Sequence, residues 1–510
     1  MEGVRGKLAK GTAWISAAGL ITNSLGFIST IVLARFLVPS DFGLVAFATT
    51  ILAVLSSVTD LSLNSALVQH RSPTIDHFDT AFTLGLARSV VIAIVFCAAA
   101  LPVSIYAHEP RLVPVMLVLA IGVVLTGMAN PRAIMVTRDL VFWQQFLLTV
   151  AQRLTTFIVA VTIAVIFRSY WAIVWGSLIG QIVNVIISYT ILPYLPRVGI
   201  KHTKELINFS VWLTAGQMIN TINWNFDQLL IGAFIGRTQL GFYTVGNNLA
   251  ILPTRETTRP ITTTLFPAFS RLKDDKERLG AAYQKSQGLV TAIALPMGVG
   301  MALLAEPLVH LFMGARWHPV VLIIQALASV FAIQTIGTLS QPLAMASGDT
   351  RLLFNRDLQS FLLRVPFMIV GILLDGLAGV VYARIVTGMI VVFFHMQVVK
   401  RITGLTFAVQ FAANIRSLAS VCVMVAVVFP LTHQVERFGA SVMDLALEIA
   451  ILASFGAVSY LGANAAMWVI MGKPEGPERE IIKGLSSMIG RFRSQMAPVL
   501  EHKSQSRSTK

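Results

Sequence analysis

Ionisable and amide side chains interrupt a long apolar part of the chain between residues 208 and 266. Asn220, Asn223 and Asp227 are spaced i, i+3 and i+7, which places them on one face of a helix. Arg255 and Arg259 follow, one helical turn apart. An arginine can hold an anion through two hydrogen bonds, and a buried carboxylate can carry a proton or a sodium ion. The pattern predicts a hydrated cavity in which such chemistry could take place.

Further candidates lie in this and in neighbouring apolar stretches. Trp224 and Asn247 accompany the residues above, and Arg88 and Arg153 belong to the first half of the chain. Asp60 is a second carboxylate and, with the aspartate above, a candidate for ion coupling. A charge in hydrocarbon costs at least ~2.5 kcal/mol, so it should face a cavity or a partner. The alternative is that these groups only bond neighbouring helices, where each hydrogen bond contributes ~0.6 kcal/mol on average.

The composition indicates the elements that position these residues. Of 510 residues, 55% are hydrophobic and only 12% are charged, with a mean hydropathy of +0.74. Soluble proteins carry roughly 25% charged residues. Apolar stretches of at least ~18 residues recur along the chain, and each is long enough to cross a bilayer as a helix. The sequence therefore predicts an all-α integral membrane protein.

We expect about fourteen transmembrane helices, whose approximate limits are 13–37, 43–67, 78–106, 112–136, 142–167, 171–194, 208–235, 240–266, 286–313, 319–345, 358–374, 377–398, 415–432 and 441–471.

The charges between these spans predict the orientation. Basic residues concentrate in alternate loops, as in 195–207 and 267–285, which marks those loops and both termini as cytoplasmic. The net charge of +15 is mainly this topology signal and suits an anionic inner leaflet. No soluble basic domain exists to hold a nucleic acid. The two cysteines, Cys97 and Cys422, fall within spans and imply no disulfide framework.

An internal repeat relates the two halves at an offset of 198 residues, pairing Gly43 with Gly241 and Leu67 with Leu265. The repeats begin six helices apart, so they share one orientation and would be related by a pseudo-twofold axis along the membrane normal. We therefore expect two parallel six-helix lobes and two trailing helices. The predicted domains are 1–200, 201–405, 406–472 and a cytoplasmic tail, 473–510, whose apolar face suggests an interfacial helix.

Specific motifs carry a family resemblance. The stretch "FDQLLIGAFIGRTQLGFYTVGNNLAILP", the following "TTTLFPAFSRLKDDKERL" and the earlier "VLARFLVPSDFGLVAFA" resemble the Wzx-type polysaccharide flippases. These are exporters of the multidrug/oligosaccharidyl-lipid/polysaccharide (MOP) superfamily. The resemblance covers about residues 8–410, and its motifs are dispersed glycines and turns.

The resemblance implies a flippase of the bacterial inner membrane that moves a polyprenyl-pyrophosphate-linked oligosaccharide between leaflets by alternating access. The cargo would be a precursor of lipopolysaccharide, capsule or exopolysaccharide. The cavity candidates above would bind its head. Implied partners are this lipid-linked glycan, membrane lipid, and the glycan polymerase and glycosyltransferases of the same pathway. No cofactor is expected beyond a coupling Na⁺ or H⁺.

Three alternatives stay open. A lipid II flippase of the same superfamily would also have a cationic cavity. A drug/cation antiporter would bind cationic drugs through carboxylates. A membrane-embedded glycan-processing enzyme would need a catalytic group, and the sequence has no HExxH, GxSxG or P-loop motif. We therefore expect a transporter without enzymatic activity and without a metal site.

Overall fold

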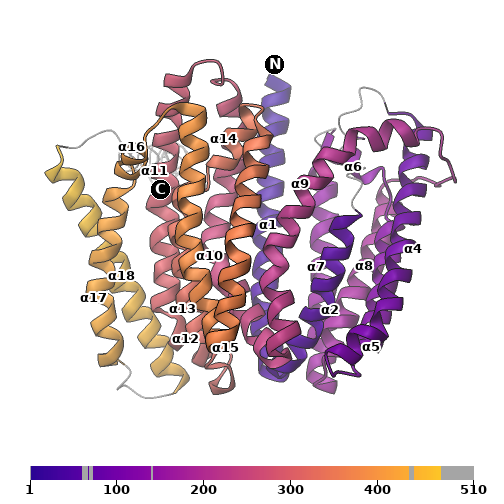
Figure 1. Cartoon of the computed structure of the whole chain (residues 1–510), viewed down its shortest axis with the longest axis horizontal. Helices are drawn as coiled ribbons and strands as arrows, with labels where there is room; N and C mark the ends of the chain where they lie inside the picture. Colours follow the sequence, from indigo (N-terminus) through magenta and orange to yellow (C-terminus); the bar gives the residue numbers. More distant parts are fainter. Residues whose placement is uncertain (1, 60–66, 68–72, 139–141, 436–440, 473–510) are drawn as a thin grey trace, which may run out of the picture.

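The computed structural model describes residues 2–59, 67, 73–138, 142–435 and 441–472, and every regular element in these ranges is a helix. Figure 1 shows the helices standing side by side, with the N-terminus at one end of the molecule. We call that end the inner end, following the predicted orientation, and the opposite end the outer end. The all-α membrane fold predicted from the composition is confirmed.

The first half of the chain forms α1 (Glu2–Phe36), α2 (Pro39–Val58), α4 (Ile75–Tyr106), α5 (Leu112–Gly127), α6 (Ala133–Arg138), α7 (Phe142–Phe167) and α8 (Trp171–Ile191). We call these helices the N-terminal bundle. The start of α2 follows from its sequence: proline suits the first helical position because it has no N–H to leave unpaired. The carboxylate of Asp41 accepts a hydrogen bond from the backbone N–H of Val38 (3.4 Å), which caps this end.

The second half begins with α9 (Thr203–Leu230) and a π-helical turn (Ile231–Ile235). Gly236 follows with a φ of 113°, which favours glycine and lets the chain reverse at the outer end. The C-terminal bundle then comprises α10 (Arg237–Ser270), α11 (Lys276–Leu303), α12 (Ala305–Phe312), a 3-10 turn (Ala315–Trp317), α13 (Val320–Gln334), a second 3-10 turn (Thr335–Gly337), α14 (Ser340–Ala346) and α15 (Thr350–Thr403). The trailing helices are α16 (Phe407–Ala412), α17 (Ile415–Val435) and α18 (Val442–Ile470).

Ten helices in the described ranges are long and apolar enough to cross a membrane. One of them, α15, is broken at Asp375 and Gly376, where the sequence predicts the junction between two spans. The shorter α5 and the polar α9 and α10 are not among the ten. Fourteen spans therefore stay a prediction, as do the domain limits at residues 200, 405 and 472.

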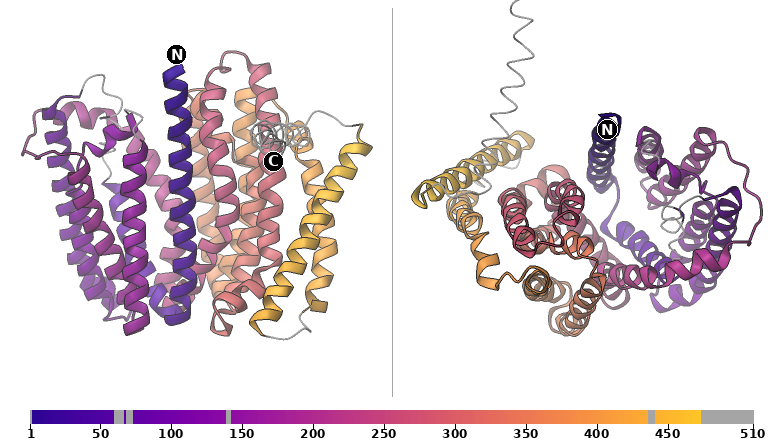
Figure 2. Two further views of the ribbon diagram at one scale, coloured as in Figure 1. Left: turned by 180° about the vertical axis from the view of Figure 1, so that it is seen from behind. Right: turned by 90° about the horizontal axis from the view of Figure 1, so that it is seen from above.

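The two bundles meet along α2 and α10, and α9 packs against both α2 and α15 (Figure 2). Two glycines allow the helices to touch. A Cβ on Gly43 would lie 1.8 Å from the carbonyl oxygen of Arg237, and a Cβ on Gly241 would lie 1.8 Å from that of Pro39. These are the residues that the 198-residue offset pairs, so the contact is reciprocal. Such reciprocity is what a twofold relation between the repeats produces.

A buried aromatic cluster supports this contact at the outer end. Trp317 is fully buried and meets the rings of Phe42 and Phe242 edge-on, with centroids 5.2 and 6.0 Å away. Its indole N–H donates to the carbonyl of Ala34 (2.8 Å), which ties the C-terminal bundle to α1. The core there is continuous between the bundles and includes Leu44 and other apolar residues from both halves.

Candidate functional site

A polar cavity of about 670 Å³ lies beside α10 in the C-terminal bundle. One wall is a strip of α10 that presents six polar side chains: Thr254, Arg255, Thr258, Arg259, Thr262 and Thr263. Both arginines are exposed, whereas Thr254 and Thr258 are buried where the strip meets its neighbours. The spacing of the two arginines, four residues apart, places them on one face as the sequence indicates.

The opposite wall comes from the segments around α13, α14 and α15, and the sequence analysis did not single it out. It carries Gln334, Thr335, Thr338, Gln341 and His395. Gln334, Thr338 and Gln341 are spaced i, i+4 and i+7 within a predicted span, a signal that could have revealed this wall. The lining thus combines cations, hydroxyl groups and amide groups with apolar side chains such as Phe266, Phe331 and Met345. None of its described residues is an aspartate or a glutamate.

The arginines of this cavity are only lightly paired. The Nε of Arg255 lies 3.4 Å from one carboxylate oxygen of Glu256, and the other oxygen accepts a hydrogen bond from the amide of Asn23 on α1. No described carboxylate forms an ion pair with Arg259. Both guanidinium groups therefore keep donors free for a ligand.

Arg153 of α7 brings a third cation toward this region from the N-terminal bundle. Its guanidinium packs against Gly26 of α1, where a Cβ would lie 2.4 Å from one nitrogen. Its charge is close enough to that of Arg255 to be repelled by it. Among the described residues Arg153 has no ion-pair partner. The two bundles thus each contribute a cation within electrostatic reach of the other, and an anion placed between them would relieve their repulsion.

Arg88 has a different environment. Its guanidinium donates to the carbonyl oxygen of Ser56 (2.7 Å) and to the hydroxyl of Thr59 (3.3 Å) at the inner end of α2. A cation at a helix C-terminus balances the unpaired carbonyls there. The structure thus places Arg88 against a helix end, whereas its predicted cargo contact stays untested.

The polar side chains of α9 lie in two different environments. Asn220 and Trp224 are exposed, and Trp224 lines the cavity. Asn223 and Asp227 are 9% and 3% exposed, which differs from the expectation that the whole strip lines a cavity. The reason is that α15 packs over this face of α9.

Asp227 is held in a buried network. It accepts a hydrogen bond from the hydroxyl of Tyr243 (2.7 Å) and forms an ion pair with the Nε of Arg384 (3.1 Å). Arg364 donates to the backbone carbonyl of Asn223 (2.7 Å) close by. The alternative, bonds between neighbouring helices, therefore describes Asp227, whereas the side-chain oxygen of Asn223 is buried without a hydrogen-bond partner among the described residues. A role of Asp227 in ion coupling stays a prediction.

Two further candidates lie elsewhere. Asn247 is half-buried on α10 and does not line the cavity. Asp60, the second ion-coupling candidate, lies outside the described residues, as does the tail from residue 473.

The outer end between the bundles is closed by a set of contacts that we call the outer clamp. Arg237 of α10 forms an ion pair with Glu109 (2.7 Å) and donates to the carbonyl of Ala107 (3.0 Å). Arg35 of α1 donates to the backbone carbonyls of Leu311 and Phe312. A hydrogen bond from Arg111, opposed by burial, lowers the pKa of Glu109 and keeps it ionised. These contacts close the described conformation at its outer end, and the exposed Arg255 and Arg259 lie nearer the inner end.

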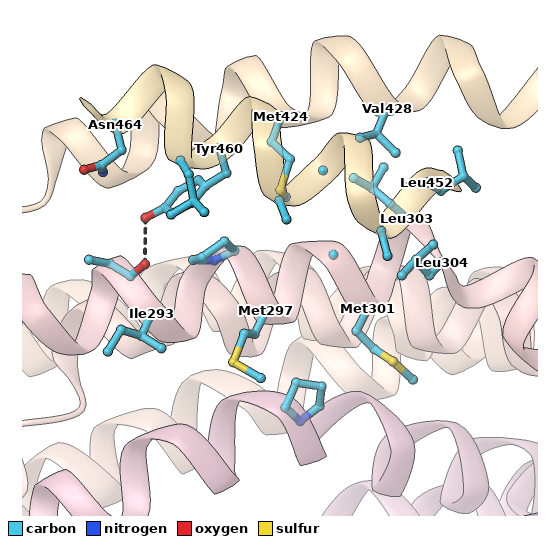
Figure 3. A pocket seen from close by; sticks show the side chains of 18 residues that line it. Ile293, Met297, Met301, Leu303, Leu304, Met424, Val428, Leu452, Tyr460 and Asn464 are labelled. Atoms are coloured by element: carbon cyan, nitrogen blue, oxygen red, sulfur yellow. Dashed lines mark hydrogen bonds between the residues drawn. The ribbon is translucent and has the colours of Figure 1, made fainter. Parts of the chain in front are cut away.

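A second cavity lies on another side of α10, and its lining is almost entirely apolar (Figure 3). It has a volume of about 610 Å³ and runs between α11 and the pair α17 and α18. Met297, Met301 and Met424 point into it, and the hydroxyl of Tyr460 is satisfied by the carbonyl of Ala292 (2.7 Å). Pro253 of α10 closes one side. We call this cavity the apolar groove.

Comparisons with known proteins agree with this architecture. The chain is 22% identical over 413 residues to the lipopolysaccharide biosynthesis protein WzxC of Escherichia coli strain K12, covering 79% of this chain and 83% of that protein. It is also 22% identical over 455 residues to the succinoglycan biosynthesis transport protein ExoT of Rhizobium meliloti, covering 89% and 92%.

Solved structures share the fold. The lipid II flippase MurJ in an inward closed conformation superposes with a TM-score of 0.71 at 16% identity, covering 89% of this chain and 99% of that one. An inward-facing multidrug resistance transporter of the MATE family of the MOP superfamily gives 0.61 at 12% identity, covering 76% and 96%. These two likenesses show a shared fold. Residues 32–322, more than half of the chain, match the model of a family described as "Polysaccharide biosynthesis protein", and the chain belongs to that family.

Proposed function

We propose that the protein is a flippase that moves a polyprenyl-pyrophosphate-linked oligosaccharide from the inner to the outer leaflet of a bacterial inner membrane, with both termini cytoplasmic. The observation that carries the proposal is the cavity beside α10, in which Arg255 and Arg259 are exposed inside a membrane protein. Family membership and the named relatives support a role in polysaccharide biosynthesis.

The cavity offers each part of the cargo head a matching group. Sugar hydroxyls cannot enter hydrocarbon without losing the hydrogen bonds of water. Threonine hydroxyls and the amides of Gln334 and Gln341 can replace those bonds. The pyrophosphate carries charge, and arginine binds phosphate oxygens in pairs. Arg153 faces the same region from the other bundle, so the head could be held between the two halves.

The apolar groove offers a place for the lipid chain. Adjacent residues of α10 serve the two cavities: Pro253 borders the groove, and Thr254 and Arg255 border the polar cavity. Burial of apolar surface gains about 25 cal/mol per Å², so a prenyl chain would be favoured in the groove or in the bilayer beside it. An amphiphile with an anionic head and an apolar tail fits both environments at once.

Alternating access requires that the closed outer end open. The outer clamp is built from one ion pair and a few hydrogen bonds to backbone carbonyls, and the glycine contact between α2 and α10 lies at the same end. These contacts can separate when one bundle rocks against the other, as in transporters built from repeats. The head would enter at the inner end and leave after the clamp opens.

Two of the alternatives are less well supported by the cavity. A drug/cation antiporter would need carboxylates, and the described lining has none. Lipid II shares the polyprenyl-pyrophosphate chemistry, so a lipid II flippase differs only in the glycan. No group in the described cavity lining favours an enzymatic role.

Coupling to sodium or protons, through Asp227 or Asp60, stays part of the hypothesis, as do a polymerase and glycosyltransferases as partners.

Reconstituted vesicles test the proposal. The purified protein should move a polyprenyl-pyrophosphate-linked oligosaccharide across the bilayer, which an impermeant glycosidase detects as a change in accessible sugar. A polyprenyl-linked sugar without the pyrophosphate serves as the matched control and should move far more slowly. Equal movement of both lipids would refute the role of the anionic head. Transport of a cationic dye instead would support the antiporter.

A further inference from the structure

Three side chains with metal-binding atoms gather at the outer end of the C-terminal bundle. Glu306 and His310 lie on α12 four residues apart, so they share one face of that helix. His318 follows the 3-10 turn after α12 and joins them from the start of α13. One donor atom from each residue lies within 4.8 Å of the donor atoms of the other two.

The chain around these residues is held firmly. His318 follows Trp317, which is fully buried and bonded to Ala34 of α1. The rings of His310 and His318 are stacked nearly parallel, with centroids 5.5 Å apart and an interplanar angle of 9°. Gly314, with a φ of 87°, makes the reversal that brings the two histidines together. The three donors are therefore preorganised by the fold.

The arrangement also leaves space for a bound ion. Glu306 and His310 are half-buried and His318 is exposed, so solvent can reach the set. Glu306 and His318 border a cavity of about 530 Å³ that continues along α13 and α15. Ligands of a tetrahedral zinc ion lie roughly 3.4 Å apart, given metal–ligand bonds of ~2.1 Å. Small side-chain rotations would bring donors now within 4.8 Å to that spacing.

We propose that Glu306, His310 and His318 bind a divalent transition metal ion, with zinc as the best match. Two imidazoles and a carboxylate supply three ligands, and the cavity leaves a fourth position for water. The ion would join α12 to the start of α13 and so fix the turn between them. Leu311 and Phe312, whose carbonyls receive Arg35 in the outer clamp, are the last residues of α12, directly before that turn. The proposal does not depend on the identity of the cargo.

Cobalt titration of the full-length protein, in detergent and with any affinity tag removed, tests the site. After treatment with a chelator, the protein should bind one Co²⁺ per chain with visible ligand-field absorption, and Zn²⁺ should displace it. The variants His310→Gln, His318→Gln and Glu306→Gln should each bind at least about 10-fold more weakly, because each loses one of three ligands.

His108→Asn is the matched control. His108 is an exposed histidine at the outer end of the other bundle, and asparagine tolerates its positive φ of 49°. This variant should bind Co²⁺ like the natural protein. Circular dichroism and gel filtration must show all variants folded. Absence of a one-to-one site in the natural protein, or unchanged affinity in any of the three ligand variants, would overturn the proposal.

Discussion

Two groups of arginines in the C-terminal bundle differ in environment. Arg364 and Arg384 are 8% and 3% exposed, and Arg384 is ion-paired with Asp227. Arg255 and Arg259 are exposed to the cavity beside α10, and among the described residues only Arg255 has an ion-pair partner, at 3.4 Å. A buried charge is tolerated only where partners offset its lost hydration. The first group therefore holds helices together, and the second has donors left for a ligand.

The comparison predicts opposite results from substitution. Removing the carboxylate partner of a buried arginine should lower stability, since the remaining charge cannot reach water. Removing the exposed arginines should lower transport and leave stability unchanged.

The largest effect is expected for Asp227→Asn. This change leaves Arg384 without its carboxylate in a buried site, and breaking such a pair costs about 3–5 kcal/mol of unfolding free energy. Reversible unfolding in mixed micelles measures the loss. Adding Arg384→Met to Asp227→Asn should restore part of the stability, because the unpaired charge is removed. Unchanged stability in the single variant would show that the network is not structural.

The next effect concerns Arg255→Ala combined with Arg259→Ala. Each charge-assisted hydrogen bond contributes about 1.5–3 kcal/mol, so transport in vesicles should fall at least ~100-fold. The unfolding free energy should change by less than about 1 kcal/mol, because both side chains are exposed.

The matched control is Arg271→Ala with Lys273→Ala. These are two exposed cations beyond the inner end of α10, so the control removes the same charge. It should transport normally. If the Arg255 and Arg259 double variant kept full transport, or gave normal surface polysaccharide in cells, the distinction between buried and exposed arginines would be contradicted.

Gly43→Ala and Gly241→Ala sharpen the comparison by disturbing the contact between bundles. An added methyl group would meet a backbone carbonyl oxygen, so α2 and α10 must separate, at a cost of about 1–3 kcal/mol. The reciprocal geometry predicts similar losses at the two sites. Gly85→Ala is the control, since a Cβ there would have no described neighbour within 4 Å beyond the adjacent backbone of its own helix. Clearly unequal losses would argue against the twofold relation.

The smallest effect concerns Glu109 in the outer clamp. Hydrogen bonding to Arg111 lowers the pKa of Glu109 below its ordinary value of 4.5. Stability from the ionised group is therefore fully present above pH ~4.5 and is lost as the pH falls through the lowered pKa. The effect should not exceed about 1 kcal/mol, since Arg111 is partly exposed. The unfolding free energy, measured between pH 7 and pH 3, shows this contribution. In Glu109→Gln the contribution should be absent. If the variant and the natural protein showed the same dependence of unfolding free energy on pH, the assignment to Glu109 would be contradicted.

Much of the fold could be predicted from the sequence because apolar length and loop charge are local signals. The span predicted at 142–167 coincides with α7, and the break in α15 falls between two predicted spans. The repeat offset identified Gly43 and Gly241 as equivalent residues. Their direct contact could not be predicted, because the offset says nothing about how closely the bundles approach.

The site was predictable only in part, because local sequence patterns do not show which distant segments pack together. Periodicity placed Asn220, Asn223 and Asp227 on one face, yet it could not show that α15 covers the outer part of that face. The partner of Asp227 is Arg384, far along the chain, and no local pattern links them. By contrast, Arg255 and Arg259 were correctly placed together because both lie on one helix.

The central claim is that the exposed arginines recognise an anionic lipid head. The most direct measurement is the affinity of the purified protein for a short polyprenyl diphosphate, compared with the matching polyprenyl alcohol. We predict that the diphosphate binds at least about 10-fold more tightly, and that Arg255→Ala with Arg259→Ala removes this difference. Equal affinity for diphosphate and alcohol, or an undiminished preference in the double variant, would contradict the claim.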